Sequence, residues 1–69
     1  MTSFLVQYTN MKNENVTSEW IYDFHGLQSY MCTLFGKCFT AKVLKFNNNI
    51  QVGIMNVYAN TENTEWVKM

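Results

Sequence analysis

The sequence predicts an α+β domain in which one helix packs on one face of an antiparallel sheet of four to five strands, in the order β-β-α-β-β-β. Apolar residues recur at every second position in several short runs, which is the spacing of half-buried strands. One segment in the middle has apolar residues three and four positions apart, which is the spacing of an amphipathic helix. Clusters of Asn separate the runs, and Asn is common in turns because it tolerates positive φ.

The first two strands are predicted at residues 3–9 and 18–24, with a polar connector over residues 10–17 between them. In the first strand the apolar face comprises Phe4, Val6 and Tyr8. In the second strand the alternation predicts one face with Trp20, Tyr22 and Phe24 and the other with Glu19, Ile21 and Asp23. We therefore expect a hairpin with a long loop.

The helix is predicted from an apolar stripe that consists of Leu27, Tyr30, Met31, Leu34 and Phe35. Gly36 follows the stripe where a left-handed C-terminal cap is favoured, and Lys37 lies beside the negative end of the helix dipole. The sequence is consistent with two positions for the first residue of the helix. Either Asp23 caps a helix that begins near Phe24, or His25 and Gly26 form an irregular entry.

Three more strands complete the sheet, at residues 38–46, 50–59 and 65–69. Residues 47–49 are three consecutive Asn and predict a tight turn between the first two of these strands. The strand at residues 50–59 alternates strongly at Ile50, Val52 and Ile54. Residues 60–64 predict the last turn.

Apolar residues also occupy the faces opposite the main stripes, at Leu5, Ile21, Leu44, Met55 and Val57. One interpretation is a strand bulge or an error in the predicted register. The other is a second sheet face that is partly apolar and meets a partner or a second copy of the chain.

The composition indicates one small domain over residues 1–69, and we expect it not to be an enzyme. The chain has five Lys, no Arg and five acidic residues, so it lacks the clustered cations of a dedicated nucleic-acid binder. Two Cys form no disulfide framework and no signal peptide is recognisable, so we expect a reducing, cytoplasmic setting. The longest apolar run is far shorter than a membrane helix needs.

We expect no catalytic, metal or cofactor site. The soft ligands His25, Cys32 and Cys38 are scattered and do not have zinc-site spacing. His25 lies about two helical turns from Cys32, too far to activate that thiol as a nucleophile. The carboxylates form no close pair for acid–base catalysis.

An alternative site comprises Lys37, Lys42 and Lys45, which lie near Phe39 and Phe46 in the sequence. Lysines interleaved with aromatic residues on a sheet bind single-stranded nucleic acid by charge and stacking. The plainer interpretation is a solvated strand edge beside core aromatics, and nucleic acid is not expected as the sole partner.

Five features follow one another along the chain: Gly26-Leu27, Cys38-Phe39, Val43, Asn48-Asn49 and Trp66-Val67. These features extend over nearly the whole chain, and most of them are fold-making residues. With them the layout resembles the small phage anti-CRISPR proteins of the type I-F class and related small phage proteins. The resemblance implies a non-enzymatic inhibitor that binds the guide-RNA surveillance complex in the host cell. This chain departs from it in having Met31, Cys32 and Thr33 where the family has cations on the exposed helix face, which leaves the target open.

The sequence therefore predicts a phage or mobile-element protein that binds and inhibits a host defence complex. The alternatives are a nucleic-acid-binding module and a homodimeric accessory protein. The residues expected to contact the partner are Lys12, Asn15, Lys37, Lys42, Lys45 and Tyr58.

Overall fold

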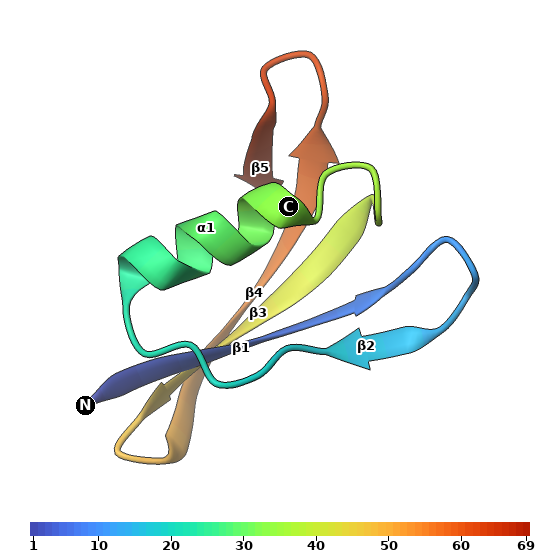
Figure 1. Ribbon diagram of the computed structural model, residues 1–69. Helices are drawn as coiled ribbons and strands as arrows, with labels where there is room; N and C mark the ends of the chain where they lie inside the picture. Colours follow the sequence, from blue (N-terminus) through green and yellow to red (C-terminus); the bar gives the residue numbers. More distant parts are fainter.

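The computed structural model describes residues 1–69 and contains one helix and one five-stranded antiparallel sheet, which is an α+β fold (Figure 1). The strand order across the sheet is β2-β1-β3-β4-β5. The elements are β1 (Thr2–Thr9), β2 (Asn15–Thr17), α1 (Phe24–Thr33), β3 (Thr40–Asn47), β4 (Ile50–Asn60) and β5 (Glu65–Lys68). The helix crosses one face of the sheet and leaves the other face without a covering layer (Figure 1). The predicted fold class and element order are confirmed.

The second strand is the main error of the sequence prediction. The strand β2 lies inside the predicted connector, and it pairs with the end of β1 from Gln7↔Thr17 to Thr9↔Asn15. The predicted strand at residues 18–24 is instead an extended segment with one bridge, in which Ile21 pairs with Phe4. Its predicted faces are also wrong, because Ile21 packs against the core while Trp20, Tyr22 and Phe24 are exposed.

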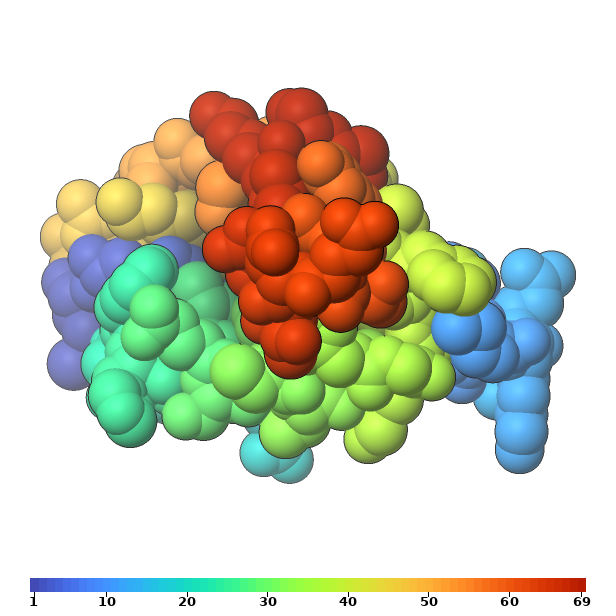
Figure 2. Space-filling model, turned by 90° about the horizontal axis from the view of Figure 1, so that it is seen from above, coloured from blue at the N-terminus to red at the C-terminus, as the bar shows by residue number.

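The loop between β1 and β2 projects from the body of the molecule (Figure 2). Its shape depends on Asn10, whose side-chain oxygen accepts hydrogen bonds from the N–H groups of Lys12 and Glu14 at 2.9 and 3.0 Å. Asn13 has a φ of 66°, a left-handed conformation that Asn adopts more readily than most residues. The loop is therefore an ordered turn built by Asn side chains.

The helix begins at Phe24 with Asp23 as its cap, which is the first of the two predicted alternatives. Asp23 has extended backbone angles, and its carboxylate accepts a hydrogen bond from the N–H of Gly26, which makes it the N-cap. The helix ends at Thr33, two residues before the end of the predicted stripe, and Leu34 closes it with an N–H to the Met31 carbonyl oxygen at 3.1 Å. Gly36 has the expected left-handed backbone, with a φ of 84°.

Strands β3 and β4 form a hairpin whose two-residue turn is made by Asn48 and Asn49, both with positive φ. Such turns match the right-handed twist of the strands they join. The register shifts between Lys45 and Phe46, which marks a bulge beside Gly53. After this bulge Val57, not Ile54, faces the helix and is buried. The predicted inner stripe of this strand is therefore wrong, since Ile50, Val52 and Ile54 are all exposed.

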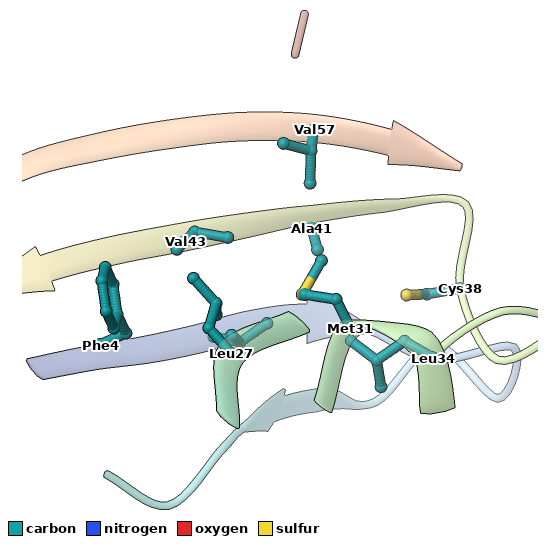
Figure 3. Packing of buried hydrophobic residues seen from close by; sticks show 9 residues of the cluster. Phe4, Leu27, Met31, Leu34, Cys38, Ala41, Val43 and Val57 are labelled. Carbon is teal, nitrogen blue, oxygen red and sulfur yellow. The ribbon is translucent and has the colours of Figure 1, made fainter. Parts of the chain in front are cut away.

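The core lies between the helix and the centre of the sheet (Figure 3). Leu27 and Met31 of the helix and Leu34 directly after it pack in this core. The sheet and its connections contribute Phe4, Val6, Cys38, Ala41, Val43 and Val57. Trp66 of β5 extends this core over the end of the helix, where its indole Nε1–H donates to the Met31 carbonyl oxygen at 2.7 Å and its ring lies 5.2 Å from that of Phe35.

Candidate functional site: the uncovered face of the sheet

The face of the sheet away from the helix is the most distinctive surface of the protein, and the strand register defines its members. Side chains alternate between the two faces of a strand. The cross-strand pairs Leu5↔Leu44 and Leu44↔Ile54 therefore lie on the face opposite the core pair Val6↔Val43. We call this surface the open face.

One half of the open face is apolar. Leu44 is buried although it is not part of the helix-side core, and Leu5 beside it is half-buried. Trp20 lies on the Phe46 ring with centroids 5.0 Å apart and planes at 75°, an edge-to-face contact. Ile54 completes this half at the β4 side and is 54 % exposed.

The other half is a shallow polar hollow of about 410 Å³ that is lined mainly by side chains from β1, β2, β3 and β4. Its polar side chains are those of Gln7, Thr9, Asn15, Thr17, Thr40, Lys42 and Asn56. Lys42 is the only charged side chain among them. Thr9 donates a hydrogen bond from Oγ1 to Asn15 Oδ1 at 3.0 Å, which fixes one wall of the hollow. The hollow therefore offers amide and hydroxyl groups around one cation.

All six residues predicted to contact a partner are exposed, but they lie on three separate parts of the surface. Asn15 and Lys42 line the polar hollow, and Tyr58 follows on the same face, opposite Thr40. Lys12 and Lys37 line a second hollow of about 340 Å³ between the β1–β2 loop and the end of the helix. Lys45 lies apart on the helix side of the sheet, opposite Phe4 and Gly53.

The lysines considered for nucleic-acid binding do not share a surface. Lys42 and Lys45 are separated by three positions in one strand, so they point to opposite faces. Lys37 follows the helix and borders the second hollow. Phe46 is engaged with Trp20, while Phe39 lies before β3 and is 69 % exposed. The open face combines only one of these cations, Lys42, with the Phe46 ring.

The thiols differ strongly in their surroundings. Cys32 is exposed on the helix, whereas Cys38 is buried in the core, where burial raises the pKa of its thiol above the ordinary value. No three His, Cys, Asp or Glu side chains gather closely enough to hold a metal ion. The helix is too short and too polar to cross a membrane.

Sequence reasoning noticed part of the open face and misassigned the rest. Among the apolar residues noted opposite the main stripes, Leu5 and Leu44 lie on the open face, whereas Ile21, Met55 and Val57 lie on the helix side. Trp20 was missed as a member of the open face because residues 18–24 do not continue as a regular strand. The pairing of Ile21 with Phe4 places its neighbour Trp20 on the other side of the sheet.

No protein-family model matches the chain, and comparison with curated proteins and with solved structures gives no match either.

Proposed function

We propose that this protein is a non-enzymatic inhibitor that binds a host protein complex through the open face. The observation that carries the proposal is the composition of that face, an apolar half next to a hydrogen-bonding hollow with one cation. Protein interfaces combine an apolar, aromatic centre with a polar rim in this way. A face of this kind in a domain this small leaves a large share of the molecule available for a partner.

Trp20 and Ile54 form the exposed apolar centre of the proposed interface above the buried Leu44, and Lys42 and Tyr58 lie toward its polar side. Aromatic residues at the centre of an interface contribute much of its binding energy. Lys42 fits an acidic group on the partner, since it is the only charged side chain in the hollow. The separation of the lysines onto different surfaces favours a protein partner over a phosphate backbone, which is held by cations along one track.

The partner class follows from the resemblance to small phage anti-CRISPR proteins. On that basis the protein belongs to a phage or another mobile element and acts in the host cytoplasm. Its target is a host defence complex, with the guide-RNA surveillance complex as the first candidate. The second hollow, which is bordered by Lys12 and Lys37, is available for an additional contact with the same target.

The test is affinity capture from host lysate with three purified baits: the wild-type chain, a Lys42→Glu/Tyr58→Ala variant of the open face, and Lys68→Glu as the matched control. Lys68 is exposed on β5 and pairs with the buried Val57, so it lies on the helix side. We expect the wild type and the control to retain the same defence proteins, and the open-face variant to lose them at least tenfold. Recovery of no defence protein by the wild type, or equal retention by all three baits, would refute the proposal.

A further inference from the structure

The outer edge of β4 is the one long strand edge that this chain leaves open. β4 runs from Ile50 to Asn60, but β5 pairs with it only from Val57 onward. Figure 1 shows β5 beside one end of β4, with the β3–β4 turn extending well beyond it. Within residues 50–55 every residue except the bulge residue Val52 is paired with β3 on one side, and none is paired with a strand on the other. We call residues 50–55 the free β4 edge.

The opposite edge of the sheet is treated differently. There β2 pairs with the end of β1, and Ser18 donates its N–H to the Val6 carbonyl oxygen at 2.8 Å. Ile21 then exchanges two backbone hydrogen bonds with Phe4, at 2.7 and 3.0 Å. The chain covers the outer edge of β1 along almost its whole length, even with an irregular segment. The free β4 edge has no such cover.

The backbone of the free β4 edge presents hydrogen-bonding groups outward. Met69 donates its N–H to the Asn56 carbonyl oxygen at 2.9 Å, so the backbone groups of Asn56 point away from β3. Alternation along the strand then points the N–H and C=O of Ile54 in the same outward direction. A strand added at this position would receive ladder hydrogen bonds.

The side chains of the free β4 edge lack the usual protection of an open edge. Natural edges carry Lys, Pro, inward-pointing charges or bulges that discourage pairing with another chain, and of these devices the free β4 edge has only a bulge. Residues 50–55 contain no charged residue and no Pro, and only the bulge beside Gly53 interrupts them. Ile50, Val52 and Ile54 are 68, 56 and 54 % exposed, respectively. An apolar β-branched edge of this kind favours pairing with a similar strand.

The accessible surface and the radius of gyration are both larger than expected for a compact monomer of this length. A monomer of 8.1 kDa is expected to expose roughly 4,500 Å², and this chain exposes 4934 Å². Its radius of gyration is 11.7 Å, where a compact chain of this length gives about 11 Å. The chain is thus more open than its length requires.

We propose that two copies of this chain pair antiparallel along their free β4 edges, with a two-fold axis near Val52 and Gly53, to form one continuous ten-stranded sheet. A two-fold axis opposes the edge to itself, and because the edge is uncharged and the chain has no net charge, no like charges meet. Each copy has only one such edge, so the assembly closes at two chains.

The expected interface is small. Six paired residues span about 20 Å along the strand, and the molecule is 19 Å across its shortest axis, so the contact buries on the order of 400 Å² per copy. The total of about 800 Å² lies below the roughly 1,200–2,000 Å² of stable specific interfaces, which indicates a weak, reversible dimer. Pairing at this edge would also bring the apolar halves of the two open faces closer together, since Ile54 lies where the open face meets the edge.

Sedimentation equilibrium of the full chain over roughly 1 μM to 1 mM covers the affinities expected for such an area. We expect the mass to rise with concentration from 8.1 kDa to twice that value and no further. Ile54→Lys and Val52→Lys should each weaken dimerisation at least tenfold. Met11→Lys, which puts the same charge in place of another exposed apolar residue in the β1–β2 loop, should leave dimerisation unchanged.

Amide hydrogen exchange adds a readout specific to the edge. The Ile54 amide should become more protected as the concentration rises, because it would donate to the second copy. A monomer at every concentration, a dimer that tolerates both β4 lysines, a dimer without protection of the Ile54 amide, or growth beyond two chains would each overturn the proposal. None of these results depends on a host protein, so they are distinguishable from failure of the proposed function.

Discussion

Replacing Trp66 by Phe tests whether the indole joins β5 to the helix. The substitution removes the Nε1–H hydrogen bond to the Met31 carbonyl oxygen at 2.7 Å and keeps an aromatic ring beside Phe35. A net hydrogen bond contributes about 0.5–1.5 kcal/mol. The Met31 carbonyl oxygen keeps a second donor, the Leu34 N–H at 3.1 Å, so no orphaned acceptor is added to the cost. The phenyl ring also buries less apolar area than the indole. Together the two losses should lower the free energy of unfolding by about 1–2 kcal/mol.

That loss is a large share of the total, since a chain of this length is stabilised by roughly 3–10 kcal/mol. It corresponds to a fall in Tm of about 4–16 °C in thermal denaturation followed by far-ultraviolet circular dichroism. Trp20→Phe is the matched control, because the Trp20 ring contacts Phe46 but its indole N–H makes no hydrogen bond within the chain. If Trp66→Phe costs no more than Trp20→Phe, the hydrogen bond to the helix does not stabilise the fold as argued.

Four further tests address other parts of the structure. Asp23→Ala should lower the free energy of unfolding by about 1 kcal/mol through loss of the N-cap, and Asp23→Ser should restore at least half of it in urea denaturation. Asn49→Ala should cost about 1 kcal/mol because φ is 68° there, whereas Asn49→Gly should be neutral or stabilising in the same assay. Burial raises the pKa of the Cys38 thiol, so the unfolded chain loses this proton at a lower pH than the folded chain. Stability from this group is therefore present at neutral pH and falls as the pH rises past about 9, a loss that Cys38→Ala should reduce. In the folded protein a thiol reagent should modify Cys32 rapidly and Cys38 only on unfolding; equal rates would contradict the burial of Cys38.

The fold class could be predicted because the period changes sharply along the chain. The helix stripe that begins at Leu27 and the positive-φ Asn pair at the β3–β4 turn are local signals, and both appear in the structure. The strand at residues 18–24 was mispredicted. Aromatic and polar residues do alternate there, but tertiary contacts determine that the segment forms a single bridge and not a regular strand. Ile21 alone is bridged to Phe4, and Asp23 already caps the helix, so the chain has too few residues left for a strand.

The candidate site was predictable only in part, because a face depends on register and bulges. The exposure of Lys42 and Tyr58 could be predicted from the alternation along their strands. That Lys42 and Asn15 line the same hollow could not be, because it depends on the pairing of β2 with β1. The bulge beside Gly53 leaves Val52 without a partner in β3 and changes the facing of β4. A Gly within a strand is a common bulge signal, but the partner strand decides which residue is left unpaired.

The position of β1 in the sheet has a consequence for folding kinetics. β3 and β4 are joined by a two-residue turn and β5 follows closely, so this meander can form within microseconds of collapse. β1 must then join β3 across most of the chain, pairing Thr2 with Asn47 and Tyr8 with Ala41, and such long loop closures slow folding. We therefore expect the entry of β1 to be the rate-limiting event, so that substitutions at Val6 alter the folding rate while those in the β4–β5 turn mainly alter the unfolding rate.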